Sequence, residues 1–405
     1  MQCGLLGRKL GHSYSPQIHS YLGEYTYSLF EKEPDSLEGF LRSGDYTGLN
    51  VTIPYKKDVL PYCDLLTDCA VELGAVNTIV RRADGKLIGH NTDHFGFLTM
   101  VNQCGLQVCG KKVLVLGSGG ASATAVAVLR KLHAEVIVIS RTGENNYDNL
   151  SRHNDAALIV NATPVGMYPN TGVSPVDLNC FPQLEGVLDI VYNPARTQLL
   201  LDAEKCGLIS LNGLLMLVAQ AKESAEWFTG SKIPDEKITE IYNILRTQME
   251  NIVLIGMPGC GKSTVGKLLA EYINKKFVDA DTLIETQSGM TIPEIFSASG
   301  EEGFRQWESR ILAHVGKESG CVIATGGGCV TRNENYACLH QNGRIIWIKR
   351  DIRTLPTNGR PLSQMNSLEQ MYHIRRPLYE AFSDFSVENN STPQAVVEQI
   401  LEELL

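Results

Sequence analysis

The 405-residue chain has no uninterrupted apolar run that approaches the roughly 18 residues of a membrane-spanning helix. Residues 1–8 also lack the charged-then-apolar order of a secretory signal. Basic residues are not in excess, because 36 Lys and Arg face 45 Asp and Glu, for a formal net charge of -9. Nucleic acids are bound by basic surfaces, so this balance argues against them and leaves small anions open. We therefore expect a cytoplasmic protein that acts on small molecules, with no nucleic acid or membrane partner.

The chain also lacks a Cys-x-x-Cys pair, internal repeats and low-complexity tracts. Its eleven cysteines are scattered, which argues against a zinc site and for reduced thiols. A chain of 405 residues is too long to fold around a single hydrophobic core, so two or three domains are expected. The sequence gives no indication of oligomeric state.

Short apolar segments with polar turns between them predict an α/β protein. The expected strands before residue 92 are 3–7, 25–31, 48–53 and 75–81, and a helix is expected over 93–104. Buried parallel strands follow at 113–116, 135–139, 158–161 and 187–191. Amphipathic helices are expected over 214–228 and 235–248, with Asp235 as an N-cap. A fresh α/β segment begins near 249, with a strand at 252–255 and a last helix over 392–405.

Glycine-rich loops follow two of these strands. Residues 117–121 read Gly-Ser-Gly-Gly-Ala, and residues 256–263 read Gly-Met-Pro-Gly-Cys-Gly-Lys-Ser. The first loop is typical of a dinucleotide site, where backbone amides at a helix N-terminus approach a pyrophosphate. The second is a phosphate-binding loop for a nucleoside triphosphate, with Lys262 reaching the phosphates and Ser263 binding magnesium. A chain with both loops is expected to run two reactions.

The strand after the first loop indicates the dinucleotide. In an NAD site, an acidic residue at the end of this strand binds the ribose 2′-hydroxyl. Here the strand is followed by Ser140, Arg141 and Thr142. A guanidinium with hydroxyls suits a 2′-phosphate, so NADP(H) is predicted. The alternative interpretation of Arg141 is a solvated cation at a strand end.

Three polar clusters precede the first glycine loop: His-Ser-Tyr-Ser-Pro at 12–16, Asn-Val-Thr-Ile-Pro-Tyr-Lys at 50–56 and Asn-Thr-Asp at 91–93. The hydroxyls of the first cluster are expected to project together from a loop. Singly, the clusters have ordinary explanations: a Ser-Pro turn, a surface lysine and a helix N-cap. With Gly-Ala-Val-Asn-Thr at 74–78 and Asn-Ala-Thr-Pro-Val-Gly-Met at 161–167, they resemble the shikimate dehydrogenase family over residues 1–248. The resemblance implies reversible, NADPH-dependent reduction of 3-dehydroshikimate to shikimate.

The same resemblance implies roles for single residues. Lys56 and Asp93 would form the catalytic pair, since an ammonium beside a carboxylate can donate the proton that the ketone oxygen needs. The substrate would be held by Ser13, Ser15, Thr52, Asn77, Asp93, Tyr192 and Gln220. The cofactor would be contacted by Gly117, Ser118, Gly119, Gly120, Ala121, Ser140, Arg141, Thr142, Thr163, Gly213 and Met216.

The chain departs from this family's pattern at several positions. The usual Gly-x-Pro before the first cluster is Gly7-Arg8-Lys9, and serines replace the usual asparagines at Ser20 and Ser140. Only a short polar stretch, residues 143–157, separates Thr142 from the next strand, and a full crossover helix barely fits there, because a parallel crossover needs about a dozen residues or more. The adenine side of the cofactor site is therefore expected to be abbreviated.

The second loop names the nucleotide, and the residues after it indicate the acceptor. Residues 277–281, Phe-Val-Asp-Ala-Asp, are expected to end a strand with two carboxylates on one face, unless they are the capped start of a helix. Further motifs are Phe-Arg at 304–305, three glycines at 326–328, Asn-Gly-Arg-Pro-Leu at 358–362 and Arg-Arg-Pro-Leu-Tyr at 375–379. This order resembles shikimate kinase over residues 250–405, which implies phosphorylation of the 3-hydroxyl of shikimate with ATP and Mg²⁺.

This resemblance also implies single roles. Asp281 would orient the accepting hydroxyl, and the lid residue Arg360 would neutralise transition-state charge together with Lys262. The remaining substrate contacts would be Arg305, Gly327, Gly328 and Arg375. The nucleotide would be contacted by Gly259, Cys260, Gly261, Lys262, Ser263, Thr264, Arg353 and Arg360, and the metal by Ser263 and Asp279.

The expected fold is an N-terminal α/β substrate domain, a Rossmann NADP-binding domain and a P-loop kinase with a parallel sheet and flanking helices. The expected domains are 1–92 with the helices of 213–248, then 93–212, then 249–405. The leading hypothesis is a bifunctional enzyme in which the product of one site feeds the other. Two alternatives stay open: a quinate/shikimate dehydrogenase fused to the kinase, and a metabolite-sensing regulator built from inactive domains.

Overall fold

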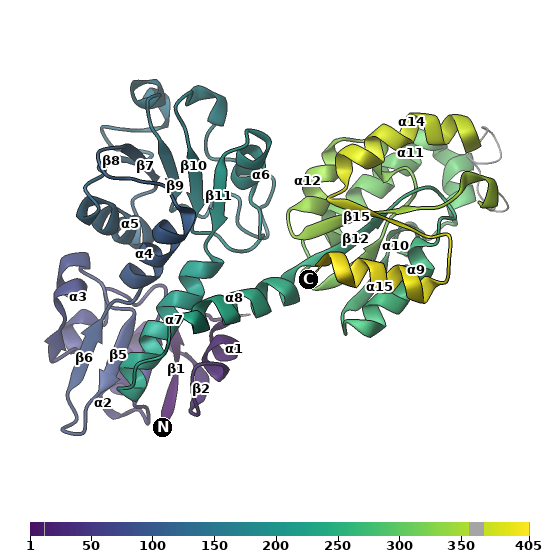
Figure 1. Cartoon of the computed structure of the whole chain (residues 1–405). Helices are drawn as coiled ribbons and strands as arrows, with labels where there is room; N and C mark the ends of the chain where they lie inside the picture. Colours follow the sequence, from purple (N-terminus) through teal and green to yellow (C-terminus); the bar gives the residue numbers. More distant parts are fainter. Residues whose placement is uncertain (12, 356–367, 405) are drawn as a thin grey trace. The chain divides into compact units, whose positions relative to one another are not determined.

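The computed structural model describes residues 1–11, 13–355 and 368–404. The chain divides into two compact units (Figure 1). The first comprises Met1–Gly166, Val173–Tyr192 and Asp202–Leu245, and the second comprises Met167–Gly172, Asn193–Leu201 and Arg246–Leu405. In the described residues each sheet has its own hydrophobic core.

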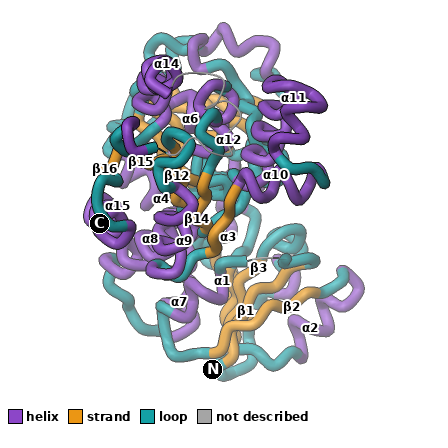
Figure 2. The backbone as a smooth tube through the Cα atoms, turned by 90° about the vertical axis from the view of Figure 1, so that its right-hand side faces the viewer, coloured by secondary structure: helices purple, strands orange, loops and turns teal. Residues whose placement is uncertain are grey.

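The first sheet is mixed and has the strand order β2-β1-β3-β5-β6-β4. Its strands are β1 (Gln2–Gly7), β2 (Thr26–Glu31), β3 (Gly48–Val51), β4 (Leu65–Leu66), β5 (Thr78–Arg81) and β6 (Leu87–His90). Figure 2 shows β1 and its two parallel partners, β2 and β3, side by side near the N-terminus. Because β5 runs antiparallel to β3 and β6, its first residues lie beside the last residues of those two strands.

The second sheet of this unit is parallel throughout and has the order β11-β10-β9-β7-β8. Its strands are β7 (Lys112–Leu116), β8 (Glu135–Ile139), β9 (Leu158–Asn161), β10 (Gly186–Asp189) and β11 (Ile209–Asn212). Between β8 and β9 the chain forms the 3-10 helix Tyr147–His153 instead of an α-helix. The interval after Thr142 is thus abbreviated, as its length predicts.

The second unit contains a parallel sheet with the order β13-β14-β12-β15-β16. Its strands are β12 (Asn251–Ile255), β13 (Lys276–Asp279), β14 (Cys321–Ala324), β15 (Gly343–Lys349) and β16 (Phe385–Glu388). The central strand β12 is buried along its whole length, as expected for a parallel sheet covered on both faces. The phosphate-binding loop leaves the carboxyl end of this strand.

The α-helices connect and cover these sheets. They are α1 (Ser15–Ser20), α2 (Leu37–Ser43), α3 (Asp68–Leu73), α4 (Asp93–Cys104), α5 (Gly120–Lys131), α6 (Gln198–Lys205), α7 (Leu214–Thr229), α8 (Glu236–Met249), α9 (Lys262–Tyr272), α10 (Ala280–Ser288), α11 (Ile292–Val315), α12 (Glu334–His340), α14 (Leu368–Phe382) and α15 (Pro393–Leu404). None of the described helices is both long and apolar enough to cross a bilayer.

The strands and helices predicted from the hydrophobic pattern are present, with small shifts at their ends. The strands expected from the pattern do not include β4, β6, β11, β15 and β16. Asp235 directly precedes α8, and its carboxylate accepts a hydrogen bond of 2.8 Å from Lys222.

Candidate active sites

The pairing of the first sheet brings three polar segments together. Lys56 follows β3, and Asp93 follows β6 as the first residue of α4. Asn77 directly precedes β5, which pairs with both strands in the opposite direction. The side chains meet at this edge: Lys56 Nζ lies 2.5 Å from Asp93 Oδ2, and Asn77 Nδ2 donates to Asp93 Oδ1 at 2.9 Å.

The Lys56–Asp93 pair is partly open to solvent, which a substrate requires. The side chain of Lys56 is 30% exposed and that of Asp93 is 14% exposed. Behind the pair, Asn77 and Thr92 are buried. A charged pair in this setting can exchange a proton with a bound molecule while the groups behind it stay fixed.

A cavity of about 760 Å³ opens at the start of the loop that carries Lys56. The hydroxyl-bearing residues Ser13, Thr52 and Tyr192 line it, together with the cations Arg8 and Lys9. Its lining contains no carboxylate among the described residues, so it suits an anion. Arg8 donates to Glu33 at 2.9 Å.

Two other predicted substrate residues lie close to these groups. Ser15 was expected in a loop but is the first residue of α1, and its amide donates to Ser13 Oγ at 3.2 Å. Gln220 lies on α7, with its Oε1 atom 3.4 Å from Thr92 Oγ1. Burial raises the pKa of the Tyr192 phenol, so this group stays protonated as a donor.

The first glycine loop joins β7 to α5. Gly117 has a φ of 106°, and a β-carbon there would lie 3.0 Å from the carbonyl oxygen of Ala162. Gly119 and Gly120 have open space where a β-carbon would stand. Backbone amides at the start of α5 are therefore accessible to a pyrophosphate. Ser118 and Ala121 complete the loop.

The residues predicted to bind the rest of the cofactor surround this loop. Ser140, Arg141 and Thr142 follow β8, which pairs with β7, so they emerge next to the loop. Arg141 is exposed. Thr163 follows β9, the other neighbour of β7, and its hydroxyl donates to Asn161 at 2.7 Å.

Gly213 and Met216 lie at the start of α7. A β-carbon on Gly213 would approach the carbonyl oxygen of Ile190 to 2.0 Å, so only glycine permits this close approach. Met216 is buried, and its carbonyl packs against Gly96 of α4.

The phosphate-binding loop of the second unit joins β12 to α9. Three of its glycines have positive φ, with values of 143° at Gly256, 82° at Gly259 and 102° at Gly261. Lys262 opens α9, and its ammonium donates to the carbonyls of Gly256 and Met257 at 2.9 and 3.1 Å. The loop is thus folded around the lysine that is expected to reach the phosphates.

The remaining residues of this loop differ in exposure. Cys260 is buried, with Sγ 3.9 Å from Lys262 Nζ. Ser263 donates to Asp279 Oδ2 at 2.6 Å, and Thr264 lines the cavity beside the loop. The Ser263–Asp279 pair presents a hydroxyl and a carboxylate together, a donor set that fits Mg²⁺.

The expectation that Asp279 and Asp281 share one face of a strand is wrong. Strand β13 ends at Asp279, which is the N-cap of α10 and accepts from the amides of Asp281 and Thr282. Asp281 lies in the first turn of that helix. The N-cap geometry separates the two carboxylates, so that Asp279 faces Ser263 while Asp281 enters the cavity.

Asp281 has an unusual electrostatic setting. Among the described residues, its Oδ1 atom is sealed from solvent without a hydrogen-bond partner. Burial, and then the nearby carboxylate of Glu308, raise the pKa of Asp281 to about 6. A carboxylate with this pKa can accept a proton near neutral pH.

Arg305 points toward the glycine triplet from α11. A β-carbon on Gly328 would lie 2.1 Å from its Nη2 atom. The guanidinium is held by Glu308 at 2.6 Å and by Glu301 at 3.1 Å. Burial raises the pKa of Glu308, and the adjacent Arg305 opposes this shift.

Glu308 is a site residue that sequence reasoning missed. It is fully buried, and a β-carbon on Gly326 would lie 2.4 Å from its Oε1 atom. The sequence could have indicated this residue through its spacing of three from Arg305, because that spacing places both side chains on one helix face.

Arg375 reaches the same triplet from α14. Its Nη1 atom donates to the carbonyl of Gly327 at 3.1 Å, and the hydroxyl of Tyr379 donates to the same oxygen. A cavity of about 490 Å³ brings together the phosphate-binding loop, Asp281, Arg305 and Arg375.

Arg353, which is predicted to bind the nucleotide, does not line this cavity. Arg353 is largely exposed and pairs with Asp351 at 2.6 Å, whereas Arg350 lines the cavity. Arg360 lies outside the described residues.

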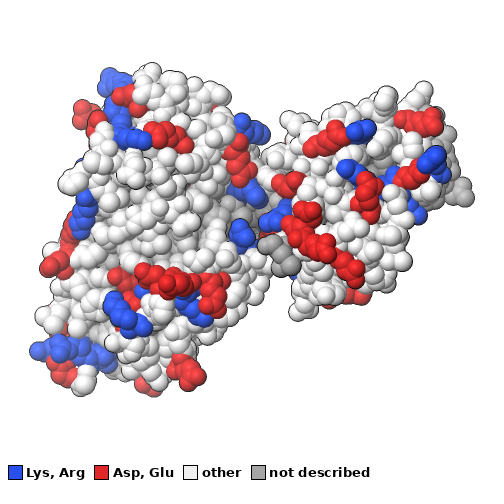
Figure 3. Space-filling model, viewed as in Figure 1, with Lys and Arg blue, Asp and Glu red and all other residues white. Residues whose placement is uncertain are grey.

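On the face drawn in Figure 3, acidic and basic side chains are interspersed with wide uncharged areas.

The folds and sites define two classes of enzyme in one chain. A mixed sheet with a lysine–carboxylate pair, next to a parallel sheet with a dinucleotide loop, is typical of a dehydrogenase. A parallel sheet with a phosphate-binding loop and a cavity lined by arginines and a carboxylate is typical of a small-molecule kinase.

Comparisons with known proteins specify both classes. The family model "Shikimate dehydrogenase substrate binding domain" matches residues 5–79, and the model "Shikimate kinase" matches residues 258–405. The NADP(+) shikimate dehydrogenase of Clostridium perfringens strain 13 is 35% identical over 265 residues, which cover 60% of this chain and 97% of that protein.

Solved structures agree with this result. Shikimate dehydrogenase 1 from Peptoclostridium difficile has 37% sequence identity and a TM-score of 0.56, and the match covers 60% of this chain and 97% of that one. A shikimate dehydrogenase from Thermus thermophilus, solved with NADP(H) and shikimate, has 30% identity and a TM-score of 0.55, over 60% of this chain and 99% of that one. The chain belongs to the shikimate dehydrogenase family, and its C-terminal part is a shikimate kinase domain.

Proposed function

We propose that this chain reduces 3-dehydroshikimate to shikimate with NADPH and then phosphorylates the 3-hydroxyl of shikimate with ATP. One observation carries the proposal: the first unit holds both the Lys56–Asp93 pair and a dinucleotide loop, and the same chain holds Asp281 beside a phosphate-binding loop. The product of the first reaction is the substrate of the second, so one chain would catalyse two consecutive steps.

In the reduction, NADPH supplies the hydride to the carbonyl carbon when it is bound. Lys56 donates a proton to the carbonyl oxygen, and Asp93 orients the ammonium from 2.5 Å. The ammonium also stabilises the negative charge that develops on this oxygen. In the reverse direction the same pair removes the proton from the hydroxyl.

The residues around this pair fit the substrate and the cofactor. Ser13, Ser15, Thr52 and Tyr192 offer hydroxyls to the carboxylate, while Gln220 offers an amide to the ring hydroxyls. Asn77 is also a predicted substrate residue, and its two amide protons are directed to Asp93 and Thr92. The open space at Gly119 and Gly120 would admit a pyrophosphate, and Arg141, which follows the strand beside β7, would pair with a 2′-phosphate. Gly213 and Met216 would border the nicotinamide.

In the phosphoryl transfer, Asp281 accepts the proton of the 3-hydroxyl. Arg305 and Arg375 bind the shikimate carboxylate, which a planar guanidinium matches in shape. Lys262 and Arg360 would bind the phosphates, and Ser263 and Asp279 would hold Mg²⁺, which neutralises phosphate charge when bound. Gly327 and Gly328 allow the substrate to approach the backbone, and Arg353 contacts the adenine.

A second candidate activity for the first unit is quinate oxidation. A quinate dehydrogenase from Corynebacterium glutamicum, solved with NAD, has 26% identity and a TM-score of 0.54. Arg141, in place of an acidic residue, favours NADP and the biosynthetic direction. A clear preference for NAD, with efficient oxidation of quinate, would instead support this candidate.

The test is a single reaction that contains the purified full chain, 3-dehydroshikimate, NADPH, ATP and Mg²⁺, followed by mass spectrometry. The expected product is shikimate 3-phosphate. Lys56→Met should leave the substrate unreacted, and Lys262→Met should accumulate shikimate. Shikimate as the sole product of the unmodified chain would refute the kinase half, and unreacted substrate would refute the dehydrogenase half.

A further inference from the structure

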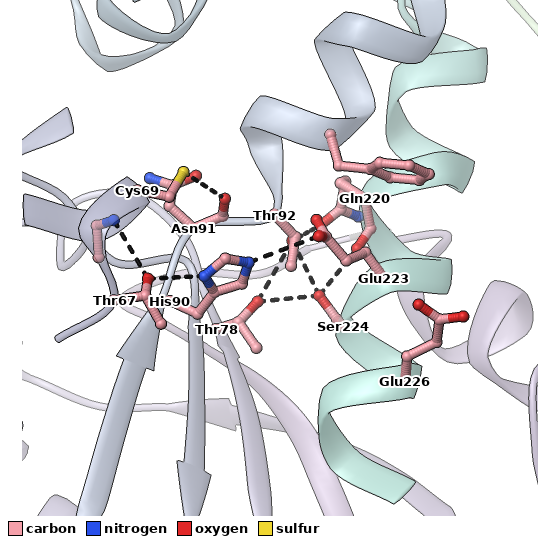
Figure 4. A network of polar contacts seen from close by, with 12 residues as sticks. Thr67, Cys69, Thr78, His90, Asn91, Thr92, Gln220, Glu223, Ser224 and Glu226 are labelled. Carbon is pink, nitrogen blue, oxygen red and sulfur yellow. Dashed lines mark hydrogen bonds and ion pairs between the residues drawn. The ribbon is translucent and has the colours of Figure 1, made fainter. Parts of the chain in front are cut away.

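One buried serine that this reaction scheme does not use lies behind the Lys56–Asp93 pair. Ser224 is on α7, one turn after Gln220, and is fully buried. Figure 4 shows its side chain facing Thr78 and Thr92, which come from the sheet side of the network. Its Oγ atom lies 2.9 Å from Thr78 Oγ1 and 3.0 Å from Thr92 Oγ1.

The donors available to each group decide the direction of these hydrogen bonds. Ser224 donates its one proton to the carbonyl of Gln220 at 2.9 Å, along its own helix. It also accepts a hydrogen bond of 2.7 Å from Asn50 Nδ2. Thr78 directs its own proton to the amide oxygen of Asn77 at 3.0 Å, so the second lone pair of Ser224 is left to accept from Thr92 Oγ1 at 3.0 Å.

This direction matters for Asn77. The amide nitrogen of Asn77 donates to Asp93 Oδ1 at 2.9 Å and to Thr92 Oγ1 at 3.0 Å. The amide oxygen accepts from the backbone of Thr92 at 2.7 Å and from Thr78 at 3.0 Å. Since the Thr92 proton points to Ser224, the lone pairs of Thr92 face the amide nitrogen of Asn77. Together with the backbone amide of Thr92, this arrangement presents the nitrogen of Asn77, and not its oxygen, to Asp93.

The geometry points to Ser224 as a positioning residue for ketone reduction, acting through Thr92 and Asn77 on Asp93. The inference rests on the dehydrogenase function proposed above. Without the serine hydroxyl, the Thr92 proton can turn to the amide oxygen of Asn77, 3.2 Å away, and compete for it. Asn50 would also lose an acceptor in a buried site, where an unpaired donor is costly. The amide of Asn77 would then be held less firmly toward the catalytic carboxylate.

The first test is Ser224→Ala in the full chain, with steady-state kinetics for each substrate. The kcat/KM for 3-dehydroshikimate should fall about tenfold, because an oriented hydrogen bond to a charged group is lost. The KM for NADPH should stay within about twofold, since Gly213 and Met216 lie at the other end of α7. Ser224→Thr keeps the hydroxyl and should recover most of the loss. Thr99→Ala is the matched control, because it removes a hydroxyl that bonds the Phe95 carbonyl within α4.

The second test is a double-mutant cycle with Thr92→Val. If Ser224 acts through Thr92, the double variant should be no worse than Thr92→Val alone. Multiplied losses, an equal rise in both KM values, or an unchanged Ser224→Ala variant would overturn the positioning role alone. An unmodified chain that does not reduce 3-dehydroshikimate would overturn this role and the dehydrogenase function together.

Discussion

The ammonium of Lys56 lies 2.5 Å from the carboxylate of Asp93, although the two residues are 37 positions apart in the sequence. Each follows a different strand of the mixed sheet, and the antiparallel β5 between those strands adds Asn77 to the same edge. The dehydrogenase pair is therefore a product of strand pairing, and it involves no residue of the kinase site.

Lys56→Met should abolish reduction and leave phosphorylation unchanged. Loss of the proton donor should lower kcat for 3-dehydroshikimate by about 10²- to 10⁴-fold. Both activities are measured on one preparation, with the exposed neighbour Lys57→Met as the control. A kinase loss of similar size in Lys56→Met would show that the two sites are not independent.

Arg141→Leu should weaken NADPH binding far more than NADH binding. Removal of a guanidinium that pairs with the 2′-phosphate should raise the KM for NADPH about tenfold or more, with little change for NADH. Arg152→Leu, an exposed arginine of the neighbouring 3-10 helix, serves as the control. Equal effects on both cofactors would mean that Arg141 is only a solvated cation.

The kinase should lose activity in mild acid. Asp281 must be ionised to accept the proton of the hydroxyl, and burial together with Glu308 raises its pKa to about 6. The kcat/KM for shikimate should therefore be constant above this pH and fall about tenfold per unit below it. Reduction by the same chain, measured in the same buffers, separates this effect from unfolding. A profile that is flat down to pH 5 would contradict the role of Asp281 as base.

Asp281→Asn should abolish phosphorylation and stabilise the second unit at pH 7. In the unfolded chain this group ionises above about 3.8, but in the folded chain only above about 6. Its ionisation therefore costs stability that begins above pH 4 and is complete above pH 6, on the order of 3 kcal/mol. Thermal unfolding at pH 7.5 and at pH 4 measures this difference, and the gain should vanish at pH 4.

A contrasting variant makes this stability prediction specific. Asp279→Ala removes the N-cap of α10 and should lower the stability by about 1 kcal/mol. Destabilisation by Asp281→Asn at pH 7.5 would show that the ionised carboxylate is well compensated in the folded protein.

Glu308→Gln should weaken shikimate binding to the kinase. Arg305 would lose its buried counter-charge at 2.6 Å, so its guanidinium would no longer be held toward the substrate carboxylate. The KM for shikimate should rise about tenfold, with a smaller change in the KM for ATP. Glu301→Gln removes the more exposed partner of the same arginine and should change the KM less than twofold. Equal effects of the two variants would argue against an anchoring role for Glu308.

Local sequence determined much of this protein. The two glycine loops, the strands before them and the order of polar motifs predicted two nucleotide sites and both enzyme classes, because a loop that holds phosphates requires glycines at fixed spacing after a strand. The short interval after Thr142 likewise predicted the missing crossover helix, which a 3-10 helix replaces.

Other features were decided by the tertiary structure. The different directions of Asp279 and Asp281 arise from the N-cap of α10, and the pKa of Asp281 arises from burial beside Glu308. Ser224 meets Thr92 and Asn50 only when α7 packs against the mixed sheet. Hydrophobic periodicity and motif spacing act over a few residues, whereas burial, desolvation and hydrogen-bond direction depend on neighbours far away in the chain. For that reason the sequence identified the reacting groups, and the fold set how they are held.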